Sequence, residues 1–138
     1  RVDRVSVGAP TDITLGHYTL PQPGHDKLPA AVRTVGKHQA TTVTGTDYTL
    51  AMVPLMGWDQ PAEVIYPKGL HPVSNVCALP TLRQHVEGTR IFVTLQLWKK
   101  GASFTDRELQ PVKAVKVSRD QRTVVVTLAT GEKKTVRF

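Results

Sequence analysis

Residues 112–138 read VKAVKVSRDQRTVVVTLATGEKKTVRF, and this stretch decides the fold class. It contains three runs rich in Val and Thr, at residues 112–118, 122–129 and 133–138. β-branched residues favour strands because they pack well on a pleated, half-buried surface. The two links between the runs, Arg119-Asp120-Gln121 and Thr130-Gly131-Glu132, are short enough for hairpins. The stretch therefore predicts a three-stranded antiparallel meander at the end of the sequence.

The preceding residues repeat the same pattern of short apolar or β-branched runs separated by Gly, Pro, Asp or Asn. The sequence shows no long amphipathic helix and no internal repeat. About nine or ten strands in one domain predict an all-β fold, an antiparallel β-sandwich, with a closed β-barrel as the alternative. The runs expected to form strands before the meander are residues 2–7, 12–20, 30–35, 38–44, 47–55, 62–66 and 89–99.

Residues 47–55 are apolar on both faces of the expected strand, with Leu50 and Met52 on one face and Ala51 and Val53 on the other. Such a pattern indicates a central strand that is covered on both sides. Three segments are expected to be connections instead. They are the proline-rich residues 21–29, the irregular residues 67–86 with a short turn of helix at 80–86, and the polar residues 101–111.

The 138 residues have the composition of a single globular domain, with 40% hydrophobic and 21% charged residues. No stretch approaches the roughly 18 apolar residues of a membrane span, which predicts a soluble domain without a membrane partner. The sequence starts at Arg1 and reads as a strand at once, so we expect a domain excised from a larger protein. The single cysteine, Cys77, leaves the compartment open, with a secreted or periplasmic location slightly favoured.

The net charge of +7 is concentrated near the end of the sequence. Residues 1–98 hold eight Lys or Arg and seven Asp or Glu, whereas residues 99–138 hold ten and four. A basic block can bind nucleic acid, an anionic polysaccharide or an acidic neighbouring domain, and it can also be an ordinary solvated sheet face. The meander carries Lys and Arg but only one aromatic residue, Phe138, so nucleic acid is the less favoured partner.

Five histidines are present, but none has the spacing of a metal motif such as HExxH. His17, His71 and Asp59 form one candidate polar or metal cluster, whereas the ordinary interpretation is that each histidine is structural. Cys77 has apolar neighbours and is expected in the core. Ser74 lacks the GxSxG turn that exposes a hydrolase nucleophile. The residues therefore predict no cofactor and no catalytic group in the isolated domain.

A candidate binding surface lies on the strand expected at residues 89–99. Ile91, Val93, Leu95 and Leu97 alternate with a second set that we expect on the face away from the core: Arg90, Phe92, Thr94, Gln96 and Trp98. Aromatic rings interleaved with polar groups can stack on sugars or bases. The alternative is that another strand or domain covers this face. Trp58, in the turn Gly57-Trp58-Asp59, is a second candidate contact with the same two interpretations.

Three segments together resemble the β-sandwich that follows the helical toroid in heparinase II/III-like proteins and related polysaccharide lyases. They are residues 12–21 (DITLGHYTLP), the Gly57-Trp58-Asp59 turn, and the meander with its TLATGE turn. The resemblance implies a sandwich that packs on a neighbouring catalytic domain and shapes a cleft for a polysaccharide. It brings no set of ligand residues with it.

The sequence thus leads to three hypotheses about function. The first is an accessory β-sandwich domain of a carbohydrate-active enzyme, with an anionic polysaccharide as a possible ligand. The second is a protein–protein interaction or assembly module without ligand chemistry. The third is non-specific nucleic-acid binding through the basic meander.

Overall fold

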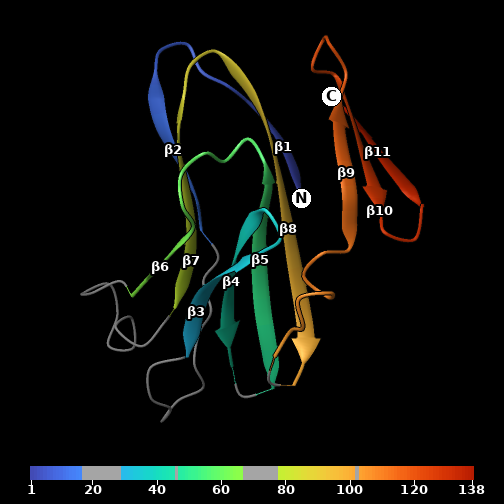
Figure 1. The fold of residues 1–138 in the computed structure, drawn as a ribbon. Helices are drawn as coiled ribbons and strands as arrows, with labels where there is room; N and C mark the ends of the chain where they lie inside the picture. The colour runs from blue at the N-terminus through green and yellow to red at the C-terminus, as the bar shows by residue number, and fades with distance from the viewer. Residues whose placement is uncertain (17–28, 46, 67–77, 102) are drawn as a thin grey trace.

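The computed structural model describes residues 1–16, 29–45, 47–66, 78–101 and 103–138, which form eleven antiparallel strands in three sheets (Figure 1). The all-β class is confirmed, and the described residues contain no helix that is long and apolar enough to cross a membrane. The strands are β1 (Val2–Ser6), β2 (Thr11–Gly16), β3 (Ala30–Val35), β4 (His38–Thr44), β5 (Tyr48–Met56), β6 (Glu63–Ile65), β7 (Leu79–Val86), β8 (Thr89–Lys100), β9 (Val112–Val117), β10 (Thr123–Leu128) and β11 (Lys133–Arg137).

The central layer is a five-stranded sheet in the order β1-β8-β5-β4-β3. β5 and β8 pair from Tyr48 opposite Lys100 to Met56 opposite Val93. Residues 50–53 of β5 are all buried. Neighbouring residues of a strand point to opposite faces, so β5 is covered on both sides, as its apolar pattern predicts.

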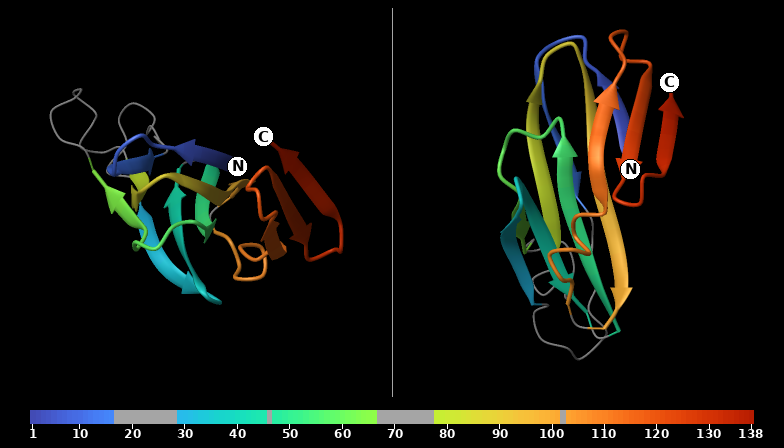
Figure 2. Two further views of the ribbon diagram at one scale, coloured as in Figure 1. Left: turned by 90° about the horizontal axis from the view of Figure 1, so that it is seen from above. Right: turned by 45° about the vertical axis from the view of Figure 1, so that its right-hand side comes forward.

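A second sheet, in the order β2-β7-β6, covers one face of the central sheet (Figure 2). Leu15 of β2 and Leu82 of β7 pack against Met52 of β5, and Val64 of β6 belongs to a cluster with Val43 of β4. Two sheets that face each other across a shared core form a sandwich. Among the described strands there is no closed barrel.

The short turn of helix expected at residues 80–86 is wrong, because these residues belong to β7. Pro80 lies near the start of β7, before the pairing with β2 begins at Thr81 opposite Gly16. A missing N–H is tolerated at such a position.

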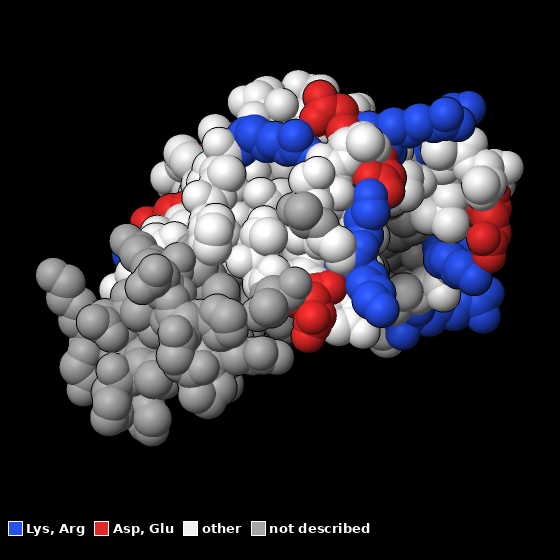
Figure 3. All heavy atoms as spheres, turned by 90° about the horizontal axis from the view of Figure 1, so that it is seen from below, with Lys and Arg blue, Asp and Glu red and all other residues white. Residues whose placement is uncertain are grey.

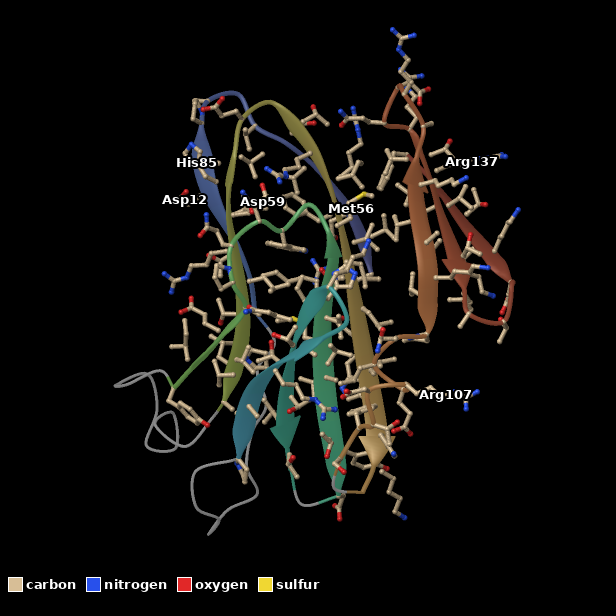
Figure 4. All side chains as sticks on the ribbon, viewed as in Figure 1. Asp12, Met56, Asp59, His85, Arg107 and Arg137 are labelled. Atoms are coloured by element: carbon tan, nitrogen blue, oxygen red, sulfur yellow. The ribbon has the colours of Figure 1, made fainter. Side chains whose placement is uncertain are left out.

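The opposite face of the central sheet is covered by the meander and by residues 103–111. Val124 of β10 packs with Ile91 of β8, and Met56 lies between β8 and the meander (Figure 4). Phe104 and Leu109 are buried in a cluster with residues of β3, β4 and β5. The expectation that residues 101–111 form only a polar connection is therefore wrong, since two of them complete the core.

Glu108 links the covering segment, residues 103–111, to β8 on its solvent-exposed side. Its carboxylate accepts hydrogen bonds from Lys99 Nζ at 2.7 Å and from the Thr105 backbone N–H at 2.8 Å. The bond from Lys99, followed by those from Thr105, lowers the pKa of Glu108 to about 2. The carboxylate therefore keeps its charge and its partners through the mildly acidic range.

The predicted meander is confirmed as the sheet β11-β10-β9. Val117 lies opposite Val124, and Lys133 lies opposite Thr127. The first link contains Gln121 with φ of 55°, in the left-handed region. Only the strand ends differ, by at most one residue, from those expected.

Gly57 is the point at which the chain leaves β5 and starts the loop toward β6. Its φ is 87°, in the left-handed region that favours glycine. A Cβ atom at this position would lie 2.3 Å from the Ile91 carbonyl oxygen and 2.9 Å from Phe92 Cδ1. The carbonyl oxygen belongs to the backbone of β8, so the loop can approach this strand only without a side chain.

Gly57→Ala is expected to lower the free energy of unfolding by more than about 3 kcal/mol, since left-handed strain adds to a clash with fixed backbone. Gly88→Ala is the matched control, because Gly88 has φ of 67° and an added Cβ would meet no atom within 4 Å. Strain alone should cost the control about 1–2 kcal/mol. Urea denaturation of both variants measures the difference, and equal losses would contradict the close-approach explanation.

Candidate functional site

A pocket of about 260 Å³ opens between the β3–β4 hairpin and the loop that follows β5. The hairpin contributes Lys37 and His38, and the loop contributes Trp58, Asp59 and Gln60. The pocket therefore combines an ammonium group, an imidazole, an aromatic ring, a carboxylate and an amide. Figure 4 shows Asp59 above the centre of the molecule, on this loop.

Two glutamine side chains from facing sheets hold the loop in place. Gln84 Oε1 of β7 accepts a hydrogen bond from the Asp59 backbone N–H at 2.6 Å. Gln39 Oε1 of β4 accepts one from the Ala62 backbone N–H at 3.1 Å. Gln84 is itself only 5% exposed, so its amide is positioned by the core. The loop is thus fixed to both layers of the sandwich, and its shape is set before any ligand binds.

Trp58 is the largest side chain of the site, and it contacts neighbouring side chains on several sides. Its Nε1–H donates to Thr94 Oγ1 at 2.9 Å, and its ring centroid lies 4.4 Å from that of Phe92 with the planes tilted by 46°. The ring also packs against the cluster of Leu15 and Met52. A second pocket, of about 160 Å³, lies beside Trp58 and Phe92 near β1 and β2. Trp58 therefore contributes to the walls of two pockets.

Arg90 of β8 forms an ion pair with Asp59 across the loop. Its guanidinium carbon also lies 5.9 Å from the centroid of the Phe92 ring, within cation–π range. The Asp59 side chain is 65% exposed and that of Arg90 is 31% exposed. A pair this open to solvent adds at most about 1 kcal/mol to stability. Its main effect is to fix the direction of the Asp59 carboxylate at the pocket.

His38 is the titratable group of the pocket whose pKa is shifted. Partial burial lowers the pKa of His38 below its usual 6.5, and the positive charge of Lys37 lowers it further. A hydrogen bond with the Pro54 backbone carbonyl opposes both effects. His38 is therefore neutral at physiological pH. At that pH its ring can donate or accept a hydrogen bond but adds no charge to the pocket.

The structure brings together four of the predicted site residues, namely Trp58, Asp59, Arg90 and Phe92. Phe92 and Thr94 are each 1% exposed, so their expected place on a face away from the core is wrong, and the alternative that other strands cover this face is confirmed for them. Trp58 and the sheet β2-β7-β6 lie on that side of the strand, so both faces of its first half are buried.

Gln96 and Trp98 do not join this group. Trp98 lies six residues beyond Phe92 on β8, which is about 20 Å along an extended strand. Trp98 is 57% exposed, in contrast to Phe92. The five side chains expected to share one surface are therefore divided between a buried cluster and the far end of the strand.

The predicted cluster of His17, His71 and Asp59 falls partly outside the described residues, which include neither histidine; Cys77 also lies outside them. Within the described part of the chain, no group of three or more His, Cys, Asp or Glu side chains is placed to hold a metal ion. Asp59 instead pairs with Arg90. Sequence reasoning missed Lys37, His38, Gln39 and Gln84, because their spacing carries no motif and only the fold brings them to the loop.

Asp59 is the only carboxylate among the described residues that line the pocket. No family model matches the sequence, and no curated protein or solved structure is significantly similar to it. The pocket is therefore the observation from which a function can be proposed.

The bond between Trp58 and Thr94 should be measurable as a coupling energy in a double-mutant cycle. Trp58→Phe removes the indole donor, and Thr94→Val removes its buried acceptor while keeping the shape. We expect each single variant to lose stability and the pair to show about 1 kcal/mol of coupling. Thermal or urea unfolding of the four proteins gives this energy, and strictly additive losses would show that the bond adds nothing.

The pKa of His38 should be lower than that of an exposed histidine, and Lys37→Gln should raise it by removing a nearby positive charge. Because the folded-state pKa lies below the unfolded value of 6.5, the unfolded state binds the proton more readily. Stability contributed by His38 is therefore present above pH 6.5 and is lost as the pH falls through the folded pKa. NMR titration of the imidazole protons measures both midpoints, with His38→Gln to assign the signal. An unchanged midpoint in Lys37→Gln would contradict the electrostatic part of this explanation.

Proposed function

We propose that this chain is an accessory β-sandwich domain of a carbohydrate-active protein, and that the pocket beside Trp58 contacts a polysaccharide. The observation that supports the proposal is a preformed pocket with one aromatic wall and polar groups of four kinds around it. Sugar rings present apolar C–H faces and hydroxyl edges, and such a pocket can satisfy both. The catalytic step would belong to a neighbouring domain of the full-length protein.

The size of the pocket favours one unit of a chain over a free small molecule. Pockets for drug-sized ligands usually measure about 300–1,000 Å³, and this one is smaller, at about 260 Å³. A single small subsite gives weak affinity unless neighbouring units of the ligand are also bound. A polymer that enters a larger cleft, partly formed by another domain, fits this expectation.

The charges around the pocket favour an acidic sugar unit. Asp59 is already paired with Arg90, and His38 is neutral at physiological pH. Among the described residues, Lys37 lies within salt-bridge distance of no carboxylate. Its ammonium group is therefore available for a carboxylate or sulfate of the ligand.

Lys37→Gln is expected to weaken binding of an oligogalacturonate by about tenfold or more, since one charge-assisted hydrogen bond contributes about 1.5–3 kcal/mol. Arg107→Gln is the matched control, because it removes the same charge from the covering segment at residues 103–111, where Arg107 points away from the molecule (Figure 4). NMR shift perturbation or calorimetry with the full chain measures both affinities. Equal weakening by the two variants, or no binding by the wild type, would overturn the proposal for this pocket.

A second candidate function, a protein–protein interaction module, is favoured by the exposed rings at the other end of the β5–β8 pair. Tyr48 and Trp98 are 59% and 57% exposed. Tyr48 is two residues from Leu50, which lies opposite Trp98, so the two rings share one face of the sheet. A wild-type chain that binds no saccharide but self-associates through this face would support this function instead.

A further inference from the structure

The outer face of the meander has a composition unlike that of its inner face. The inner face is mainly apolar, with Val115, Val117, Val124 and Val126 packed against the central sheet, and Lys134 lies on it at the edge strand, opposite Val126. The alternate residues point the other way. They are mostly hydroxyl-bearing or basic: Ala114 and Lys116 on β9, Thr123, Val125 and Thr127 on β10, and Lys133, Thr135 and Arg137 on β11.

This outer face carries positive charge and no negative charge. Lys116, Lys133 and Arg137 are exposed, and among the described residues no carboxylate lies within salt-bridge distance of any of them. Figure 4 shows Arg137 directed away from the rest of the molecule. In Figure 3, Lys and Arg side chains gather on the right-hand side, which is the side of the meander.

The two acidic residues of the meander are held at its turns. Asp120 accepts hydrogen bonds from Ser118 Oγ at 2.5 Å and from the Arg122 backbone N–H at 3.1 Å. These bonds lower the pKa of Asp120, that from Ser118 most strongly. Glu132 pairs with Lys134, 2.6 Å away. Both carboxylates are thus engaged locally, and neither neutralises the three outer cations.

The register of the meander sets the spacing of these cations. Lys116 lies opposite Val125, which lies opposite Thr135; Lys133 and Arg137 are each two residues from Thr135, in opposite directions. With strands about 4.8 Å apart and about 3.4 Å per residue, Lys116 is about 12 Å from each of the other two. Lys133 and Arg137 are about 14 Å apart by the same measure. Val125 and Thr135 lie between the three charges, and Thr123 and Thr127 lie beside Arg137 and Lys133.

We infer that the outer face of the meander is a second binding surface, which takes an acidic polysaccharide. Widely spaced cations separated by hydroxyl groups match a polymer that carries one charge on a sugar ring with neutral hydroxyls between. Duplex DNA, with one charge per about 1.7 Å, would leave most of its phosphates unmatched. Single-stranded nucleic acid needs aromatic rings for stacking, and the outer face has none. The inference rests on the proposed class of ligand but not on the pocket beside Trp58.

The test measures binding of the full chain to polygalacturonate and to a short DNA duplex at several salt concentrations. The triple variant Lys116→Gln, Lys133→Gln and Arg137→Gln should bind polygalacturonate about tenfold more weakly, since three exposed ionic contacts are lost. A control with the same loss of charge elsewhere, Arg4→Gln, Lys100→Gln and Arg107→Gln, should keep nearly full affinity. All six positions are exposed, so circular dichroism should show folded proteins.

Three other outcomes of this test overturn the inference, and a fourth would support it while removing the pocket as a site. Equal weakening by both triple variants would show that only the net charge matters. Tighter binding to DNA than to polygalacturonate, removed by the outer-face variant, would assign the surface to nucleic acid. Lys37→Gln in the same assay separates the two sites. If Lys37→Gln weakens polygalacturonate binding and the outer-face triple variant does not, only the pocket is a binding site. A loss in the outer-face variant alone would leave only the meander.

Discussion

The pairing of β5 with β8 is the constraint on which the rest of the structure depends. These two strands form the middle of the central sheet, and both faces of β5 are covered over residues 50–53. One face requires the sheet β2-β7-β6, while the other requires the meander and the segment that holds Phe104 and Leu109. A strand pair that is apolar on both sides cannot be stable in a two-layer fold with one open face. The three-layer arrangement follows from that requirement.

The same pair also creates the candidate site. The register shifts between Pro54 and Met56, so β5 turns away from β8 just before Gly57. The chain then crosses to the second sheet, and the crossing loop carries Trp58 and Asp59. Its backbone polar groups have left the sheet and need new partners, which Gln39 and Gln84 supply. A rigid, polar loop at the point where a buried strand ends is a common location for binding residues.

How much the sequence could predict depends on how far apart in the sequence the residues that determine each feature lie. The meander and the two-sided pattern of β5 are local, and both predictions were confirmed. Phe92 was wrongly expected on a solvent-exposed face. Alternation of residue types along a strand shows that its two faces differ, but it does not show that one of them is open to solvent. The pocket could not be predicted, since Lys37 and Gln84 are far from Trp58 in sequence. Only the pairing order of the strands brings them together.

The basic residues of the meander have a structural explanation that accounts for only part of the observation. β9 and β11 are the edges of their sheet, and charged residues on edge strands prevent pairing with another chain. The middle strand, β10, accordingly has no charged residue. Edge protection favours Lys but does not require an edge without carboxylates, whereas β9 and β11 carry only Lys and Arg. The uniform sign increases the mutual repulsion of these side chains and so lowers stability. The acidic ligand that we propose would offset this repulsion.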